Sequence, residues 1–311
     1  MAGNTGLVLV TGGAGFIGSH LVGRLSAEGI ATRVLDNFSS GSRHNLDGPG
    51  AGVELIDGDV REPAVASVAC AGVDVIVHLA AIASVQVSVE HPRDVLSVNS
   101  DGTLAMLEAA RAAGVRRFVL ASTAAVYGSA GDLPRRESMA PDPESVYGVS
   151  KVAAEHVVRV FGRMYGMETV ILRYFNVFGP RQSPDSAYAG VLSRFARAIR
   201  AGEPVTVFGD GRQSRDFVYV ANVVNATLIA SRSPRAVGNT YNVGSGIETS
   251  LIDALERMMA LAGNPVEVRH LPARPGDIRR SVADISSIRG IGYRVEVDFR
   301  SGCAALLAER P

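Results

Sequence analysis

The sequence predicts an α/β fold in which a parallel sheet carries helices on both faces. Short apolar runs alternate with helical patterns through the first 175 residues, as in a sheet built from strand–helix–strand units. Hydrophobic residues make up 47% of the 311 residues, which is enough for a sizeable core. These observations indicate a Rossmann-type, doubly wound parallel sheet, followed by a smaller C-terminal α/β part that binds the substrate.

The predicted elements follow one another in the order that this fold requires. Strands are predicted at 7–10, 31–35, 53–56, 73–79, 117–121 and 169–173, and helical patterns notably at 17–28, 100–113 and 149–165. Right-handed crossovers place the carboxyl ends of all the strands at one edge of the sheet, where ligands bind. Polar residues follow the strands at this edge: Asp59, His78, Ser122, Thr123 and Asn176.

The first strand runs directly into a glycine-rich turn, Thr11-Gly12-Gly13-Ala14-Gly15-Phe16-Ile17-Gly18. Glycine lets the backbone turn tightly and approach a ligand, and the helix that follows presents free N–H groups to a pyrophosphate. Asp36 ends the second run about 20 residues further on, where a carboxylate accepts ribose hydroxyls. The alternative is a plain tight turn. It is disfavoured because strand, glycines, helix and acid come in the order of a dinucleotide site.

Asp36 also predicts which dinucleotide is bound. Its carboxylate would repel a 2′-phosphate, which favours NAD over NADP. Arg33, Ser40 and Arg43 lie nearby in the sequence and are able to soften this repulsion.

The second part of the chain differs from the first in its residue composition. Seven prolines punctuate shorter elements after about residue 180: Pro180, Pro184, Pro204, Pro234, Pro265, Pro272 and Pro275. Arginine also becomes frequent there. We therefore predict a dinucleotide-binding domain at 1–178, to which the chain later crosses back, and a mainly substrate-binding domain at 179–311.

Tyr147 and Lys151 lie four residues apart, so a helix places them on one face. A lysine charge beside a phenol favours the phenolate and is expected to lower the pKa of Tyr147 from about 10 toward neutrality. A phenol tuned in this way exchanges a proton with a sugar hydroxyl. Thr123, just beyond a strand end, is the candidate third member, relaying a hydrogen bond between Tyr147 and the substrate. A surface Tyr–Lys pair is the alternative for this motif alone.

Several segments together resemble the extended short-chain dehydrogenases/reductases. They are the glycine turn, His78-Leu79-Ala80-Ala81, Asn99, the residues before Val126-Tyr127-Gly128, Tyr147 with Lys151, the run 172–181 (LRYFNVFGPR), the run 214–220 (SRDFVYV) and Arg274-Pro275-Gly276-Asp277. The resemblance extends over essentially the whole chain. Within the family it is closest to nucleotide-sugar 4-epimerases of the UDP-glucose/UDP-galactose type.

The resemblance implies an isomerase that contains NAD. Tyr147 takes the proton of the sugar 4-hydroxyl while hydride passes from C4 to the nicotinamide. The 4-keto sugar then turns over, anchored by its diphosphate, and hydride returns to the opposite face. NAD is regenerated in each turnover, so it stays bound.

The resemblance also assigns residues to the two ligands. For NAD they are Gly12, Gly15, Phe16, Ile17, Gly18, Asp36, Asn37, Ser40, Gly41, Asp59, Val60, Leu79, Ala80, Ala81, Asn99, Ala121, Tyr147, Lys151 and Tyr174. For the UDP-sugar they are Ser84, Thr123, Tyr147, Asn176, Arg181, Val191, Val207, Arg215, Arg274, Asp277 and Ser281. Guanidinium groups such as those of Arg215 and Arg274 suit phosphate oxygens.

Two departures narrow the subgroup. Related 4,6-dehydratases carry an Asp-Glu pair, and related decarboxylases a Glu, where this chain has Ala124 and Ala125, so no acid is available for elimination. Ser281 aligns with a bulky aromatic residue of epimerases restricted to plain hexoses, and a small side chain leaves space for a 2-acetamido group. The runs 83–88 and 181–185 also resemble bacterial UDP-GlcNAc 4-epimerases. We expect UDP-GlcNAc/UDP-GalNAc to be preferred and UDP-Glc/UDP-Gal to be accepted.

Three other functions fit the same fold. A UDP-glucuronate 4-epimerase needs a cation for the C6 carboxylate, for which Arg181 is available, although such enzymes tend to have Thr where Asn176 stands. An NDP-sugar reductase would release reduced cofactor. A non-catalytic NAD-binding protein would not need a tuned phenol.

Composition excludes other classes of partner. The formal net charge is zero, so neither nucleic acid nor an anionic membrane is indicated. Cys70 and Cys303 have small neighbours and are expected to be buried thiols, with no metal site. No signal segment or membrane-spanning stretch is seen, and a cytoplasmic protein is expected.

Helices 100–113 and 149–165 carry extra apolar residues (Leu104, Leu107, Val157, Val158, Phe161) that predict a homodimer, unless the chain itself covers them.

Overall fold

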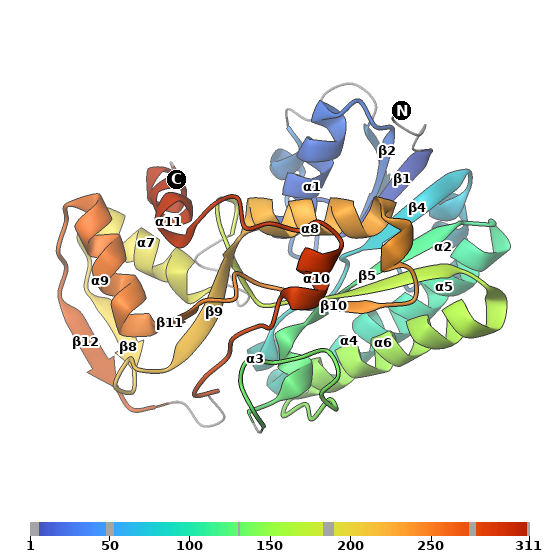
Figure 1. Ribbon diagram of the computed structural model, residues 1–311. Helices are drawn as coiled ribbons and strands as arrows, with labels where there is room; N and C mark the ends of the chain where they lie inside the picture. The colour runs from blue at the N-terminus through green and yellow to red at the C-terminus, as the bar shows by residue number, and fades with distance from the viewer. Residues whose placement is uncertain (1–5, 48–52, 130, 183–189, 274–277, 310–311) are drawn as a thin grey trace.

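In the computed structural model, which describes residues 6–47, 53–129, 131–182, 190–273 and 278–309, the chain builds one large sheet and two small ones (Figure 1). The large sheet has seven parallel strands in the order β10-β6-β5-β4-β1-β2-β3. They are β1 (Leu7–Thr11), β2 (Thr32–Asp36), β3 (Val53–Asp57), β4 (Val73–His78), β5 (Arg117–Thr123), β6 (Glu168–Tyr174) and β10 (Thr240–Val243). The strand order reverses between β1 and β4, which is where a doubly wound sheet binds its ligands.

The six predicted strands are confirmed, each to within two residues at either end. The three predicted helices are also present, as α1 (Phe16–Ala27), α5 (Gly102–Ala112) and α6 (Val146–Tyr165). Helix α6 begins earlier than predicted because the hydroxyl of Ser145 accepts the backbone N–H of Gly148 and caps it. That cap brings Tyr147 into the first turn of the helix.

The large sheet is covered on both faces, as Figure 1 shows. Helices α1 and α8 (Val220–Arg232) pack on one face, against alternate residues such as Val8 and Val10. Helices α2 (Pro63–Cys70), α5 and α6 pack on the other face, against the intervening residues such as Leu9. Both faces of these strands are buried, which explains why they are continuous apolar runs in the sequence. Cys70 lies in this second core as a buried thiol, as predicted.

The C-terminal part has a core of its own. Strands β7 (Asn176–Phe178), β9 (Ser214–Tyr219) and β11 (Glu248–Ser250) form one small sheet, and β8 (Val205–Phe208) pairs with β12 (Val268–Leu271) in another. Helices α7 (Val191–Ala201), α9 (Leu251–Ala262) and α11 (Phe299–Ala308) pack around Phe178, Phe195 and Leu255. Cys303 is buried there, also as predicted.

The chain returns to the large sheet after leaving it. Helix α8, strand β10 and the short helix α10 (Ser286–Gly290) all follow residue 178, yet they pack with β5 and β6 or contribute to the same core. Strand β10 is the one strand of the described large sheet that the sequence analysis did not predict. At four residues it is too short to give a recognisable pattern within the proline-rich part of the chain.

Short helices complete the lower edge of the large domain in Figure 1. Helices α3 (Val85–Glu90) and α4 (Pro92–Leu96) follow β4, and a wider turn at Ser97–Asp101 joins α4 to α5. None of the helices in the described part of the chain is long and apolar enough to cross a membrane.

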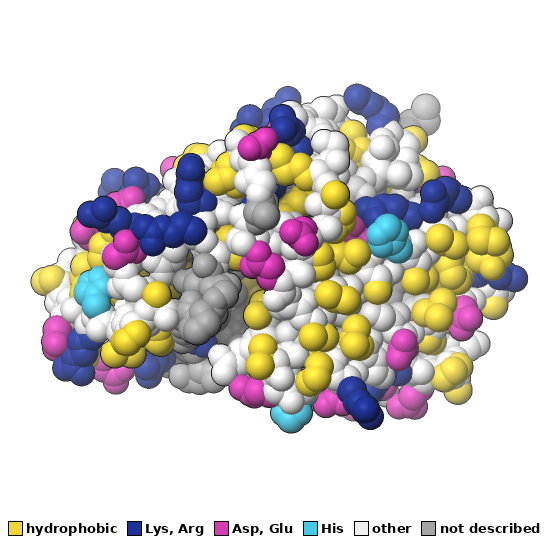
Figure 2. Space-filling model, turned by 90° about the horizontal axis from the view of Figure 1, so that it is seen from below, with side chains coloured by type: hydrophobic (Ala, Val, Ile, Leu, Met, Phe, Trp, Pro, Cys, Tyr) yellow, Lys and Arg dark blue, Asp and Glu magenta, His cyan; other side chains and the backbone are white. Residues whose placement is uncertain are grey.

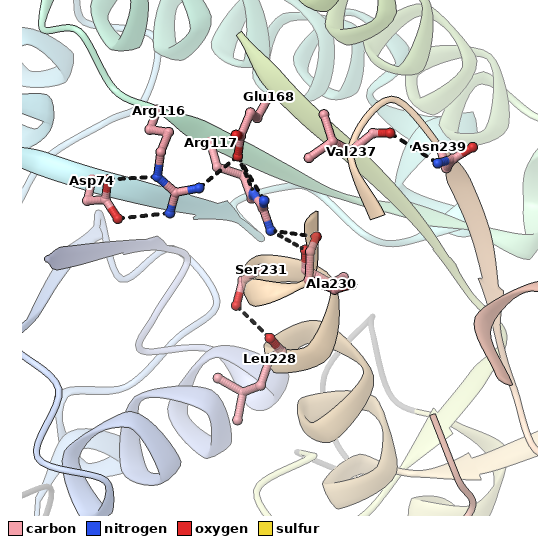
Figure 3. A network of polar contacts seen from close by, with 10 residues as sticks. Asp74, Arg116, Arg117, Glu168, Leu228, Ala230, Ser231, Val237 and Asn239 are labelled. Carbon is pink, nitrogen blue, oxygen red and sulfur yellow. Dashed lines mark hydrogen bonds and ion pairs between the residues drawn. The ribbon is translucent and has the colours of Figure 1, made fainter. Parts of the chain in front are cut away.

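A network of ion pairs ties three strands of the large sheet to the end of α8 (Figure 3). Arg116 forms ion pairs with Asp74 and Glu168 at the surface. Arg117 is almost fully buried; it pairs with Glu168 and donates to the backbone carbonyls of Ala230 and Ser233, both at 3.1 Å. Arg117 therefore satisfies the last carbonyls of α8, which have no partner within the helix.

Substitutions of Arg116 and Arg117 are expected to lower the free energy of unfolding by different amounts. Arg117→Met should lower the free energy of unfolding by about 3 kcal/mol, because it removes the donor to the buried carbonyl of Ala230 and breaks the ion pair with Glu168. Arg116→Met should cost less than about 1 kcal/mol, because that ion pair is exposed. Urea denaturation of both variants measures the difference, and equal costs would contradict the role of Arg117.

Candidate active site

A cavity of about 1320 Å³ opens at the carboxyl edge of the large sheet, where the strand order reverses. It is larger than the roughly 300–1,000 Å³ typical of a pocket for one small ligand. Its walls come from the glycine turn, from the ends of β2 to β6, from α6, and from the C-terminal part near α7. A single space therefore joins the predicted dinucleotide site to the predicted substrate site.

Most of the residues assigned from the sequence line this cavity. They are Gly12, Gly15, Phe16, Ile17, Gly18, Asp36, Asn37, Ser40, Asp59, Val60, Leu79, Ala80, Ala81, Ala121, Thr123, Tyr147, Lys151, Tyr174, Asn176 and Arg181. They are spread over 170 residues of sequence, and the parallel sheet brings them together because all its strands end at one edge.

The glycine turn is shaped by backbone crowding. A Cβ atom on Gly18 would lie 2.1 Å from the carbonyl oxygen of Gly12, and one on Gly12, whose φ is +68°, would lie 2.8 Å from the backbone nitrogen of Ala80. Helix α1 begins at Gly15 without a side-chain cap, so its first N–H groups are left for a ligand. This cradle, which a side chain would fill, fits the pyrophosphate of a dinucleotide.

Asp36 stands at the end of β2 beside this turn. Its carboxylate oxygens accept the backbone N–H groups of Ala14 and Phe38, both at 2.8 Å. Burial raises the pKa of Asp36, and the two N–H donors oppose this shift. Each oxygen keeps a lone pair for a ribose hydroxyl. Gly41 does not line the cavity; it lets its loop pack on Ala14, to which a Cβ would come within 3 Å.

The two cations that were expected to soften the charge of Asp36 have other partners. Arg33 pairs with Glu54 and donates to the carbonyls of Ala69 and Ala71, away from the cavity. Arg43 pairs with Asp57, and its guanidinium lies 4.1 Å from the centre of the Phe38 ring. A 2′-phosphate beside Asp36 would therefore meet an uncompensated carboxylate, which favours NAD.

Asn37 and Asp59 form the next part of the wall. The amide of Asn37 donates to Asp59 at 3.1 Å, and Arg61 forms an ion pair with the same carboxylate. The pKa of Asp59 is lowered, chiefly by the hydrogen bonds from Arg61. Arg61 also lines the cavity and was missed in the sequence analysis, because a surface arginine carries no motif of its own.

Thr123, Tyr147 and Lys151 line the same cavity. Thr123 ends β5, and its hydroxyl accepts the N–H of Ala125 at 3.1 Å and forms a hydrogen bond with the phenol of Tyr147. The ammonium of Lys151 donates to the backbone carbonyl of Ala121 at 3.0 Å. The end of β5 and the first turns of α6 thus place all three groups in one cavity.

The expected lowering of the Tyr147 pKa is not what the described chain shows. Burial raises this pKa, and the hydrogen bond from Thr123 opposes the shift only in part. Lys151 does not offset burial because its ammonium is turned to the carbonyl of Ala121, and burial lowers its own pKa to about 8. Spacing on a helix predicted that the two residues share a face, but not where the lysine amine is bound.

Lys151 is the only lysine among the 311 residues, so every other cationic side chain apart from histidine is an arginine. Four residues further along α6 is Glu155, a buried carboxylate that pairs with Arg159 and Arg173 and accepts the hydroxyl of Ser122 at 2.5 Å. The negative charge of Glu155 raises the pKa of Lys151 and so opposes the effect of burial.

Several assigned residues lie outside the cavity lining. Asn99 is fully buried and binds the backbone of Ile82. Ser84 is buried and caps α3 by accepting the N–H of Val87. Arg215 donates to the backbone carbonyl of Ile278 at 2.5 Å. Ser281 is 8% exposed.

Two assigned valines belong to the C-terminal core. Val207 is 2% exposed in β8, and Val191 begins α7 and packs against the same core. Neither lines the cavity, although Gly190, next to Val191, does. The assigned Arg274 and Asp277 lie outside the described residues, as does the segment 183–185 on which part of the expected sugar preference rests.

On the side of α7 and α11 the wall also contains charged residues that the sequence analysis did not assign: Arg197, Arg200 and Glu309. Arg200 donates to the carbonyls of Leu306 and Glu309, and the Glu309 carboxylate accepts the N–H of Arg181. The spacing of Arg197 and Arg200 on one helical face was a signal for this wall. The contribution of Glu309 was not visible, because it depends on where α11 packs.

Comparison with known proteins agrees with this geometry. Residues 8–244 match the family described as NAD dependent epimerase/dehydratase. A UDP-glucose 4-epimerase of Mycolicibacterium smegmatis is 38% identical over 301 residues, which are 95% of this chain and 96% of that protein.

Two solved structures superpose closely. The UDP-glucose 4-epimerase of Thermus thermophilus, in complex with NAD, is 40% identical with a TM-score of 0.89 and 97% of each chain covered. The UDP-N-acetylglucosamine 4-epimerase of Methanobrevibacter ruminantium, in complex with UDP-N-acetylmuramic acid, is 34% identical with a TM-score of 0.92, covering 98% of this chain and 99% of that one.

Alanine substitutions at two glycines of α1 are expected to have opposite effects on stability and different effects on NAD binding. Gly18→Ala should cost about 1–3 kcal/mol of unfolding free energy through overpacking and weaken NAD binding more than tenfold, because its Cβ meets the Gly12 carbonyl. Gly23→Ala, with no atom within 4 Å of the added Cβ, should stabilise by about 0.5–1 kcal/mol and leave NAD binding unchanged. Calorimetric titration with NAD distinguishes them, and unaltered binding by Gly18→Ala would refute the cradle.

The single lysine makes its titration directly measurable. NMR of the lysine side chain should give one midpoint near 8, and Glu155→Gln should lower it further. Between pH 8 and 10.5 the unfolded chain binds a proton that the folded chain has lost. Stability relative to Lys151→Met therefore rises with pH, by at most about 1.4 kcal/mol per unit. A midpoint near 10.5 would mean that the amine is not buried.

Proposed function

This chain belongs to the NAD-dependent epimerase/dehydratase family, and we propose that it prefers UDP-GlcNAc and UDP-GalNAc among the UDP-sugars whose C4 it epimerises. It is an isomerase, a UDP-sugar 4-epimerase that uses NAD. The observation that carries the activity is the meeting of Thr123, Tyr147 and Lys151 with the glycine cradle in one cavity.

Each of these residues has a role that its position supports. Tyr147 takes the proton of the 4-hydroxyl and returns it after the sugar has turned, while Thr123, bonded to the phenol, keeps it oriented toward the sugar. NAD, when bound, supplies the acceptor and then the donor of the C4 hydride. Lys151 binds a ribose hydroxyl, and it would favour the phenolate if its ammonium turned from the carbonyl of Ala121 toward Tyr147. Because burial raises the pKa of Tyr147, deprotonation depends on positive charge brought close to the phenol.

The wall beside Thr123 favours epimerisation over elimination. Ala124 and Ala125 follow the threonine in a short turn, Ala124–Tyr127, and neither has a group that moves a proton. The neighbouring carboxylate, Glu155, is buried behind Ser122 and paired with two arginines, so its pKa is lowered and it stays ionised. Tyr147 is then the acid–base group nearest to the sugar, and it serves C4 in both directions.

The preference for acetamido sugars rests on size. Ser281 is small, and the similarity to a UDP-N-acetylglucosamine 4-epimerase covers 98% of this chain. Ser281 does not line the cavity itself, so its effect on the sugar pocket would pass through the neighbouring segment 278–284, which pairs with Arg135 and β9. The roles of Arg215, Arg274 and Asp277 in holding the diphosphate stay part of the same proposal.

One observation favours UDP-glucuronate as a second substrate. Arg181 lines the cavity with a φ of +66°, unusual for a non-glycine residue, and its N–H is held by Glu309. An arginine fixed in this way is able to bind a C6 carboxylate. Asn176, which also lines the cavity, argues against this substrate, because such epimerases tend to have Thr at its position. A phosphate contact is therefore the preferred role of Arg181.

We also propose that the active form is a homodimer. Leu107, Val158 and Phe161, which suggested an interface, are covered by the chain's own core. Leu104, which also suggested the interface, is exposed, and so are further apolar residues of α6: Val149, Val160, Met164 and Tyr165. Figure 2, seen from below, shows hydrophobic side chains over this face. A second copy with the same face fits it, and light scattering at the mass of one chain would contradict the dimer.

Assays with four UDP-sugars test the substrate. UDP-GlcNAc should be epimerised faster than UDP-Glc, UDP-Gal and UDP-glucuronate, and mass spectrometry of released nucleotide should identify NAD. Ser281→Tyr should reduce turnover of UDP-GlcNAc at least about tenfold while UDP-Glc changes little, because the larger side chain should push segment 278–284 toward the sugar and narrow the space for the acetamido group. Ser281→Ala is the control and should keep both activities. No turnover of UDP-GlcNAc, or equal losses on both sugars, would overturn the proposed preference.

A further inference from the structure

A buried chain of polar groups runs beneath the cavity, and the reaction described above does not use it. At its centre is His78, the last residue of β4, which is 1% exposed. Its Nδ1 lies 2.7 Å from the hydroxyl of Thr11, at the start of the glycine turn, and its Nε2 lies 3.1 Å from the hydroxyl of Thr103 in α5. Both threonines are also buried.

The neighbours of His78 fix the direction of each hydrogen bond. The Thr103 hydroxyl donates to the carbonyl of Asn99 at 2.6 Å, so it accepts from His78, and Nε2 carries the proton. Nδ1 then accepts from the hydroxyl of Thr11, whose oxygen in turn accepts the N–H of Ala80 at 3.2 Å. Thr11, His78 and Thr103 each donate one hydrogen bond and accept another, so a single tautomer of His78, protonated at Nε2, is consistent with all of them.

Beyond Asn99, the chain continues to the catalytic helix. The amide of Asn99 binds both backbone groups of Ile82 and donates to the hydroxyl of Ser150 at 3.0 Å. Ser150 donates to the backbone carbonyl of Tyr147 at 2.7 Å. Two sets of hydrogen bonds, joined through the backbone and side chain of Asn99, therefore connect the turn that holds the cofactor to the residue that moves the proton.

We propose that His78 and Thr103 are positioning residues for C4 epimerisation, holding the helix that carries Tyr147 and Lys151 in register with the glycine turn. The proposal rests on the proposed function. Hydride and proton transfer demand that the sugar, the cofactor and the phenol be aligned together, and a displacement of about 1 Å costs up to 10²-fold in rate. Apolar packing permits small slides of one element over another, whereas buried hydrogen bonds with fixed direction do not.

His78 is suited to this task because it does not change its charge. Burial, together with the charge of Lys151, lowers its pKa to about 3. The groups in contact with it are the hydroxyls of Thr11 and Thr103 and the ring of Phe118, 5.5 Å away between centroids, and none of them titrates near neutral pH. Lys151 is the nearby charge that does titrate, with a pKa of about 8, and loss of its charge leaves the pKa of His78 low because burial is the larger cause. The chain of bonds thus stays the same over the working range of the enzyme.

Isosteric substitution tests the role of Thr103. Thr103→Val removes the hydroxyl and should lower kcat about tenfold with KM for the UDP-sugar changed less than twofold, because alignment and not binding is lost. Thr103→Ser restores the hydroxyl and should recover kcat. Asn222→Leu is the control. Asn222, in α8, is about as buried as Thr103, and its side chain binds backbone groups of Glu296 and Val297. It does not line the cavity, so its loss should destabilise the fold without lowering kcat.

An unchanged kcat in Thr103→Val, or an equal fall in Asn222→Leu, would overturn the positioning role. Nitrogen NMR of histidine in the unsubstituted holoenzyme is independent of variant folding. His78 should appear as a neutral ring protonated at Nε2 and unaltered from pH 5 to 9, and a titrating ring or an Nδ1 proton would refute the proposal. If the unsubstituted enzyme epimerises no UDP-sugar, the proposed function fails, and that result is separate from both outcomes above.

Discussion

The close crossing of two backbone segments at the glycine turn is the constraint on which the site depends. The start of α1 passes so near the end of β1 that no Cβ fits on Gly18, and the residues just after β4 leave no room for a Cβ on Gly12. Since nothing but backbone separates β1, α1 and β4 there, the N–H groups of the helix start, Asp36 and the residues after β4 face one cavity. The polar chain through Thr11 and His78 begins at the same crossing.

Buried charge is the second feature that shapes the site. Lys151 and Glu155 lie one turn apart on α6, both inside the protein, and each is held by partners from neighbouring strands. Removing such groups from water costs free energy, which the fold sustains because the large sheet is packed on both faces. The chain uses arginine for its other cations and lysine only here. Lysine, unlike arginine, is a compact charge whose pKa responds to its surroundings.

The sequence predicted a large share of the site because the strands of a parallel sheet all end at one edge, which brings the residues that follow them close together. Residues after six predicted strands had to meet at one edge, and Asp36, Asp59, Ala81, Thr123 and Asn176 do line the cavity. Prediction was poorer in the C-terminal part. Val207 is buried in its core, and Glu309 reaches the cavity wall, because loop paths and helix packing decide which residues face the ligand.

By itself, the sequence determined the six long strands, the glycine cradle, the acid that selects NAD and the pairing of Tyr147 with Lys151. These depend on local spacing and on the topology of parallel sheets, which apolar periodicity reveals. Only the tertiary structure decided the seventh strand, the raised pKa of Tyr147, the commitment of Arg33 and Arg43 to other carboxylates, and the link from His78 to Ser150. Burial and long-range partners set these features, and they arise from contacts between residues far apart in the chain.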